Sequence, residues 1–385
     1  MIYFDNAASA LPLSSAVNFI PQYGNPSSNH KAGNDSHQIV NNARQLLSDI
    51  FGGDTGSYYF TSGATESANL AIQGHCRFLR KIASTRDEII VSAVEHPAVF
   101  NTVHEMGKQG FTVHVLNVDK TGVINIPELK SLINNKTALV CIMGVNNETG
   151  VIQPINDAFQ CVKDFDIGIV TICDMVQYLT KVNTELDLDN IDCFFASGHK
   201  LGAAKGIGFL YLNEKVMIAP LFIGGGQESG LRPGTENLYG IESLSRALKE
   251  HSLKSSTYQR HVHLLKKHLL NSLEDTGVNY QLNTLNALTS DYILSLAFPG
   301  QDAGHLANYL ANKGVCISRG SACSSTSEKP SRVLSSMMLD RKTINSTIRL
   351  SFSPYNTVDD VNMFCTHIIE YNVATNNISV KSESN

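Results

Sequence analysis

Residues 57–100 read SYYFTSGATESANLAIQGHCRFLRKIASTRDEIIVSAVEHPAVF and contain a complete strand–helix–strand pattern. The apolar runs 57–61 and 87–92 are rich in β-branched and aromatic residues and are bounded by turn residues, which predicts two β-strands. Between them, residues 65–79 repeat apolar side chains at helical spacing, which predicts an amphipathic helix. A unit of this kind favours a mostly parallel sheet that helices cover on both faces.

The same alternation continues to about residue 223, and a different pattern follows it. Further strands of the sheet are predicted at residues 112–116, 137–143, 168–173, 192–197 and 206–212. Beyond them, strands are predicted at 292–298, 315–318 and 347–352, and helices at 240–275, 303–312, 331–339 and 358–371. This second set is typical of a smaller α+β unit. We therefore expect an α/β protein with a large domain at 16–250 and a small domain made of 1–15 and 251–385.

The composition of the 385 residues excludes several classes of protein. Apolar residues make up 42% and charged residues 17%, which is typical of a globular chain and not of a disordered one. The net charge of -5 provides no basic surplus for a nucleic-acid backbone. No apolar run approaches the roughly 20 residues of a membrane helix, and the N-terminus shows no signal or transit pattern. We expect a cytoplasmic protein that binds neither membrane nor nucleic acid.

The eight cysteines form no C-x-x-C pair, and most lie in apolar runs. Disulfides and a zinc site are therefore disfavoured, no metal is expected, and a reducing cytoplasm fits. Seven of the cysteines are predicted to be small buried hydrophobes. Cys323 differs because it lies in RGSACSSTSEKPS (319–331), among small residues and near Arg319 and Lys329. An exposed thiol near basic groups ionises and reacts, and an incidental free cysteine is the alternative.

Polar clusters follow five of the predicted strands directly. They are SGATES (62–67), VEHP (94–97), NNETG (146–150), Asp174 and SGHK (197–200). Because the carboxyl ends of parallel strands share one edge of a sheet, and ligands bind at that edge, we expect these segments to converge on one cleft.

Three of these clusters together point to one cofactor. The small-residue turn at 62–65 before a helix suits a phosphate, with ordinary N-capping by Ser62 or Thr65 as the alternative. Asp174 ends an apolar strand and needs a cationic partner such as a protonated pyridine nitrogen, or else it is a helix cap or half of an ion pair. Lys200 can form a Schiff base in a cleft, although many lysines lie at the surface. The combination predicts a pyridoxal phosphate site.

For two further residues, the sequence allows both a functional and a structural role. His96 can stack on a flat cofactor or shuttle protons, and a structural histidine is the alternative. Arg349 in the strand TIRLSF can clamp a carboxylate, and a structural ion pair is the alternative.

With these motifs in view, the sequence resembles the cysteine desulfurases of the NifS/IscS type, in the class V aminotransferase group of pyridoxal phosphate enzymes. The resemblance runs from YFDNAA at residue 3 to IRLSFSPYNT at residue 348. The motifs that carry it are, in order, GNPSSNHKAG, FTSGATESANLAI, EHPAV, NNETGVIQPI, Asp174 with Gln177, SGHK, KGIGFLY, GGGQE, RPGTEN and RGSACSS. It implies the type I pyridoxal phosphate fold, with a mobile catalytic loop at about 319–331.

The resemblance also implies a role for each polar residue of these motifs. Lys200 would bind the cofactor covalently, Asp174 would face the pyridine nitrogen, and Gln177 would face the ring hydroxyl. His96 would lie over the ring and move protons, and Cys323 would take the sulfur. The substrate carboxylate would be held by Asn147 and Arg349. The phosphate would be held by Ala64, Thr65, Ser197, His199 and, from the other subunit of a homodimer, Thr235.

The implied reaction converts L-cysteine to L-alanine and leaves sulfur as a persulfide on Cys323, for delivery to an acceptor protein in iron–sulfur cluster assembly or thiolation. A selenocysteine lyase or cysteine sulfinate desulfinase would use the same fold. A class V aminotransferase would not need Cys323. A catalytically weak sulfur-carrier adaptor is the alternative outside enzymes.

Overall fold

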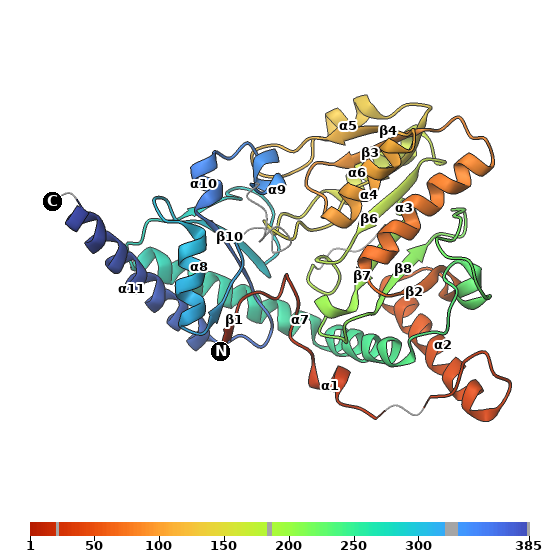
Figure 1. Ribbon diagram of the computed structural model, residues 1–385, viewed down its shortest axis with the longest axis horizontal. Coiled ribbons are helices and arrows are strands. Elements are labelled where there is room, and N and C mark those ends of the chain that lie inside the picture. The colour runs from red at the N-terminus through yellow and green to blue at the C-terminus, as the bar shows by residue number, and fades with distance from the viewer. Residues whose placement is uncertain (21–22, 183–186, 320–329, 383–385) are drawn as a thin grey trace.

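The computed structural model describes residues 1–20, 23–182, 187–319 and 330–382, and for residues 376–382 it describes the backbone alone. Its largest element is a seven-stranded sheet with the order β2-β8-β7-β6-β5-β3-β4 (Figure 1). The strands are β2 (Tyr58–Thr61), β3 (Glu88–Ser92), β4 (Thr112–Leu116), β5 (Thr137–Cys141), β6 (Val170–Asp174), β7 (Cys193–Ser197) and β8 (Gly208–Leu212). Strand β8 is antiparallel to both of its neighbours, β2 and β7, and the other neighbouring pairs of this sheet are parallel. The predicted strands and the mostly parallel sheet are confirmed.

Helices cover both faces of this sheet, as the strand sequences require. The helices around it are α2 (Lys31–Phe51), α3 (Ala64–Lys81), α4 (Pro97–Lys108), α5 (Ile126–Leu132), α6 (Ile155–Phe165) and α7 (Leu238–Asp275). In β3, Ile89 and Val91 pack into one core cluster with α3 and α4, whereas Ile90 packs into the other cluster. Because neighbouring residues of a strand point to opposite faces, a fully apolar strand is buried on both sides.

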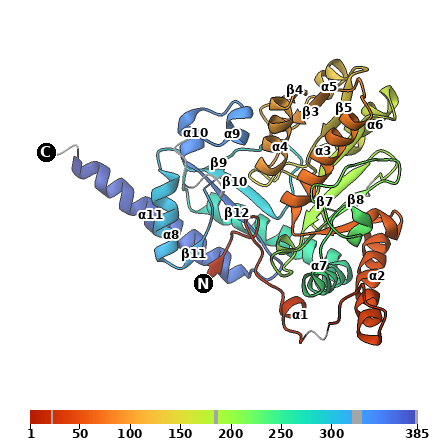
Figure 2. The same ribbon diagram turned by 45° about the vertical axis from the view of Figure 1, so that its right-hand side comes forward.

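The C-terminal part forms a three-stranded sheet with the order β12-β10-β9 (Figure 2). Its strands are β9 (Gln281–Leu282), β10 (Ile293–Ala297) and β12 (Thr347–Ser351). Its helices are α8 (Ala303–Asn312), α9 (Arg332–Ser336), α10 (Arg341–Asn345) and α11 (Val358–Ser382). Strand β1 (Ile2–Tyr3) of the N-terminal arm pairs in parallel with β11 (Val315–Cys316), and α1 (Ser14–Val17) follows that arm.

Two details of this part bear on the predictions. Helix α11 runs to residue 382, beyond the predicted end at 371. The proposed domain boundary at 250/251 falls inside the continuous helix α7, and the division into domains stays a prediction. None of the helices in the described part of the chain is long and apolar enough to cross a membrane.

The described cysteines are all free thiols, and their burial departs from the prediction at two positions. The buried thiols are Cys76, Cys141, Cys173, Cys193 and Cys365. Cys161 and Cys316 are only half-buried, so the prediction of buried hydrophobes is wrong for these two. Cys316 ends the short strand β11, which pairs with β1 in a two-stranded sheet. Cys323 lies outside the described residues.

Candidate active site

A cavity of about 580 Å³ opens at the carboxyl edge of the large sheet. The polar clusters that follow β2, β3, β5, β6 and β7 all reach it, as the convergence argument predicts. The predicted site residues that line it are Ala64, Thr65, His96, Asn147, Asp174, Gln177, Ser197, His199, Lys200 and Arg349. Thr235 is exposed and does not line this cavity.

The N-terminus of α3 forms one end of the cavity and carries no side-chain cap. Its N-cap residue is Gly63, and neither Ser62 nor Thr65 caps the helix, so the capping alternative is wrong. The first N–H groups of a helix have no partner within the helix, so an uncapped N-terminus leaves them for an anion. Glycine is needed close by, because a Cβ on Gly208 would lie 2.6 Å from the Cα of Gly63.

Asp174 ends β6 and is 5% exposed at the cavity. Its Oδ1 accepts a hydrogen bond from the Val176 N–H at 2.9 Å. Burial raises the pKa of this carboxyl to about 6, while the Val176 hydrogen bond and the charge of Lys200 oppose the rise. No ion pair of Asp174 occurs within the described part of the chain, so the ion-pair alternative finds no support. A buried carboxylate without a cationic partner suits a ligand that supplies one, such as a pyridinium nitrogen.

Lys200 ends the short 3-10 helix Gly198–Lys200 that follows β7. Its Nζ donates to the main-chain carbonyls of Ala7 and Ala8, each at 2.6 Å. The surface alternative is therefore wrong, because the N-terminal arm covers this amine. The neighbouring His199 contacts the Ser9 hydroxyl through Nδ1 at 3.1 Å, so the arm approaches both side chains.

His96 is the N-cap of α4, and its Nδ1 accepts the Ala98 N–H at 3.1 Å. The pKa of this imidazole is lowered to about 4, mainly by burial and also by the positive charges of Lys200 and Arg332. The ring is therefore neutral at pH 7, with its proton on Nε2 at the cavity. The structural interpretation of His96 is confirmed, because the ring caps a helix. The ring also lines the site, and its role at a cofactor stays a prediction.

We expect His96 to stay neutral down to about pH 4. The ring Cε1–H signal in NMR spectra of the cofactor-free protein should titrate near this value, and the His96→Gln variant would assign the signal. Because the pKa lies below that of an ordinary histidine, protonation is delayed as the pH falls. Titration of that signal near pH 6.5 would contradict the burial argument.

Arg349 in β12 is 1% exposed, which is rare for an arginine. Its guanidinium donates to the Asn147 carbonyl at 2.9 Å and pairs with Asp5 at 2.8 Å. The Nε of Arg349 is buried and has no hydrogen-bond partner within the described ranges of the chain. The ion-pair interpretation is thus correct, and the residue also lines the cavity, where a carboxylate could use the remaining donor.

Sequence reasoning missed a set of contacts that fasten α9 beside the cavity. The Ser331 hydroxyl donates to Glu148 Oε2 at 2.6 Å. Arg332 donates to the main-chain carbonyls of Ala93 and Glu95, and its guanidinium lies 3.8 Å from the ring centroid of Phe100. The Arg332 bonds hold the start of α9 against the loop that carries His96, and the Ser331 bond holds it against the loop that carries Asn147.

Glu95 is the other residue that was missed, although it precedes His96 in the VEHP motif. It is 1% exposed, its Oε1 accepts the Met143 N–H at 2.6 Å, and its Oε2 has no partner among the residues whose placement is described. Burial raises its pKa to about 8, and the neighbouring Asp174 adds to the rise. Glu95 therefore holds a proton at neutral pH and places no second negative charge beside Asp174.

We expect Arg332→Leu to lower the free energy of unfolding by about 2–4 kcal/mol, since two covered carbonyls lose a charged donor and the aromatic contact is lost. Urea denaturation would measure the change. Arg260→Leu on the exposed face of α7 is the matched control and should stay within about 0.5 kcal/mol of the unsubstituted protein. Equal stability of the two variants would show that the Arg332 contacts contribute nothing.

The large sheet, with Lys200 and Asp174 at its carboxyl edge, has the architecture of the type I fold of pyridoxal phosphate enzymes. In these enzymes a lysine binds the cofactor. More narrowly, the chain belongs to the aminotransferase class-V family, whose family model matches residues 2–364.

Known proteins similar to this chain agree with that assignment. A cysteine desulfurase from Nostoc sp. is 36% identical over 368 residues, which is 93% of this chain and 89% of the relative. A solved structure described as a NifS-like protein superposes with a TM-score of 0.89 at 32% identity, covering 96% of this chain and 98% of that one. A second structure, SspA in complex with cysteine, has a TM-score of 0.77 at 30% identity and covers 93% and 100%.

Proposed function

We propose that this protein is a cysteine desulfurase that uses pyridoxal phosphate and L-cysteine. The observation that carries the proposal is the placement at one cavity of Lys200 and the buried Asp174, which forms no ion pair with any described residue. The family assignment, the cysteine desulfurase relatives and the cysteine complex of SspA support the same reaction.

The residues present fit the cofactor at three points. Asp174 would face the pyridine nitrogen, Gln177 the ring hydroxyl, and Lys200 would bind the cofactor covalently. The uncapped N-terminus of α3 suits a phosphate. The residues proposed to hold the phosphate are Ala64, Thr65, Ser197 and His199. When bound, the cofactor supplies an electron sink that makes the Cα–H bond of the substrate acidic.

The side chains of this chain would perform the remaining chemistry. Arg349 and Asn147 bind the substrate carboxylate and orient the Cα–H bond toward Lys200. The Nζ of Lys200 takes the Cα proton. Neutral His96 would donate from its Nε2–H near the cofactor ring, because its low pKa keeps the imidazole uncharged and Nδ1 already accepts the Ala98 N–H.

Cys323 would complete the reaction. Its thiolate attacks the substrate sulfur, so an S–S bond forms while the Cβ–S bond of the substrate breaks. The electron pair of the broken bond stays with carbon, which takes up a proton. L-cysteine and one thiol thus give L-alanine and one persulfide, and no external oxidant or reductant is needed.

We also propose that the active form is a homodimer in which the exposed Thr235 completes the phosphate site of the partner subunit. The persulfide would pass to an acceptor protein of iron–sulfur cluster assembly or thiolation. The absence of C-x-x-C pairs among eight cysteines favours a reducing compartment such as the cytoplasm.

The decisive experiment is turnover of L-cysteine by the protein loaded with pyridoxal phosphate, in the presence of dithiothreitol. Alanine and sulfide should appear in equal amounts, and the protein without cofactor should produce neither. Formation of alanine only when a keto acid acts as amino acceptor would instead identify an aminotransferase. A much faster release of alanine from selenocysteine or cysteine sulfinate would identify one of the related lyases.

A further inference from the structure

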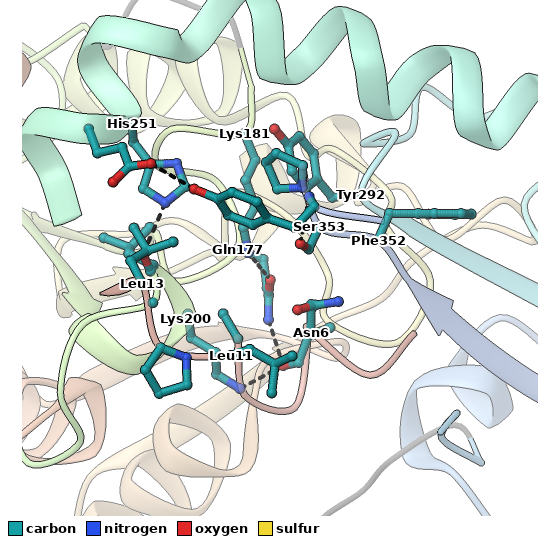
Figure 3. A pocket seen from close by; sticks show the side chains of 18 of the residues that line it. Asn6, Leu11, Leu13, Gln177, Lys181, Lys200, His251, Tyr292, Phe352 and Ser353 are labelled. Carbon is teal, nitrogen blue, oxygen red and sulfur yellow. Dashed lines mark hydrogen bonds between the residues drawn. The ribbon is translucent and has the colours of Figure 1, made fainter. Parts of the chain in front are cut away.

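A second cavity of about 480 Å³ shares Ala7, Gln177 and Lys200 with the candidate active site (Figure 3). It is enclosed by residues 10–15 of the N-terminal arm, by the turn at 352–355 and by one side of α7. Its volume is within the range of cavities that bind small organic molecules. None of the residues proposed for the substrate carboxylate lines it.

One end of this cavity holds Lys181, which no acidic group pairs with in the described part of the chain. The Nζ of the half-buried Lys181 donates to Gln177 Oε1 at 2.7 Å, and Gln177 Nε2 donates in turn to the Ala7 carbonyl at 2.9 Å. No ion pair of Lys181 occurs within the described part of the chain. Burial and the positive charges of Lys200 and Arg349 lower the pKa of Lys181 to about 7. An ammonium group has three donors, so this end of the cavity offers more donors than acceptors.

A further donor lies at the same cavity. Tyr292 is 4% exposed, and its hydroxyl has no hydrogen-bond partner among the residues that the structure describes. A buried hydroxyl without a partner costs about 1–3 kcal/mol, and a ligand that accepts its proton would recover part of that cost. Tyr292 lines the cavity together with Lys181, as Figure 3 shows.

The other charged groups at this cavity have partners. Glu250 accepts hydrogen bonds from Ser15, Tyr258 and Tyr355 and pairs with Lys254 at 3.0 Å. The Nε2 of His251 contacts the Leu201 carbonyl at 3.0 Å, and burial lowers the pKa of this imidazole, which keeps it neutral. The remaining wall is apolar and consists mainly of Leu11, Leu13, Ile293 and Phe352.

We propose that this cavity binds a small amphipathic monocarboxylate, with its carboxylate on Lys181 and Tyr292 and its apolar chain on the opposite wall. The carboxylate supplies a negatively charged partner for the protonated Lys181 and a hydrogen-bond acceptor for the Tyr292 hydroxyl. The chain buries apolar surface that water now covers. This binding site goes beyond the desulfurase reaction, because none of its ligand contacts takes part in that reaction.

Isothermal titration calorimetry of the cofactor-loaded protein with octanoate tests the proposal. Octanoate should bind with a Kd below about 1 mM, and octylamine, which has the same chain and the opposite charge, at least tenfold more weakly. Lys181→Met should weaken octanoate binding at least tenfold, and the conservative variant Tyr292→Phe about threefold. Lys266→Met is the matched control, because Lys266 is another largely covered lysine that lies outside the cavity, and it should leave binding unchanged.

Three results would overturn the proposal. Octanoate and octylamine could bind equally well, which would make the site merely apolar. Lys181→Met and Tyr292→Phe, folded with unchanged melting temperatures, could both bind octanoate like the unsubstituted protein. Arg349→Lys could abolish binding while Lys181→Met does not, which would place the octanoate in the active site. Desulfurase turnover enters none of these readouts, so the two proposals fail independently.

Discussion

Replacement of Lys200 by alanine is expected to lower the release of alanine from L-cysteine by at least about a thousandfold. Two functions are lost together, because the same amine is proposed to bind the cofactor covalently and to take the Cα proton. General base catalysis alone contributes roughly 10²–10⁴-fold. The fold should be preserved, because the Nζ of Lys200 donates to main-chain carbonyls of the N-terminal arm, which water can satisfy at this cavity.

The covalent link gives a second readout for the same variant. Borohydride reduction of the loaded protein should attach the cofactor to Lys200, and mass spectrometry of the peptides would locate it. In Lys200→Ala no peptide should carry the label. The control is Lys215→Ala, which changes an exposed lysine beyond β8 and should keep both label and turnover. A label on Lys205, which also lines the cavity, would mean that the wrong lysine has been assigned.

The parts of the site that could be predicted from the sequence are those in which a polar cluster directly follows an apolar strand. Parallel strands bring their carboxyl ends to one edge, so the order of the clusters along the chain does not matter. Asp174 and Lys200, at the ends of β6 and β7, illustrate this, because neighbouring strands place them at the same cavity. The strands of the large sheet were predicted on separate grounds, from apolar runs rich in β-branched and aromatic residues.

The parts that could not be predicted depend on main-chain groups or on burial. Lys200 binds the carbonyls of residues 7 and 8, and Arg332 binds those of Ala93 and Glu95. A carbonyl group belongs to every residue type, so such contacts leave no pattern in the sequence. The protonated Glu95 and the donor-rich Lys181 look like ordinary charged residues until their burial is known.

The N-terminal arm shows why long-range contacts escape a reading of local patterns. Its apolar residues Ile2 and Phe4 resemble any short strand, yet β1 pairs with β11 more than three hundred residues later. This pairing brings Asp5 into an ion pair with Arg349, and it brings the Ala7 carbonyl to the Nζ of Lys200, which donates a hydrogen bond to it. The arm is therefore a wall of the active site and of the second cavity, and it reaches Lys200 through main-chain carbonyls, which leave no pattern in the sequence.

Replacement of Cys323 by serine is expected to stop the release of alanine and sulfide while leaving cofactor binding intact. A hydroxyl is far less acidic than a thiol and is a much weaker nucleophile toward sulfur, so the substrate sulfur has no acceptor. The residues proposed to bind cofactor and substrate are unchanged. The cofactor absorbance should therefore still shift when L-cysteine is added, although turnover falls by at least about a hundredfold.

The matched control is Cys316→Ser, which changes the half-buried thiol at the end of β11 in the same part of the chain. It should retain turnover. Mass spectrometry after a single addition of L-cysteine should find one extra sulfur atom, a gain of about 32 Da, on the peptide with Cys323 in the unsubstituted protein and in Cys316→Ser. No persulfide should form in Cys323→Ser.

Turnover of L-cysteine that survives in Cys323→Ser, or a persulfide found on Cys316 or Cys365, would remove Cys323 from the mechanism. Because Cys365 is buried and burial raises the pKa of its thiol to about 11, the thiolate needed for attack is scarce there at neutral pH.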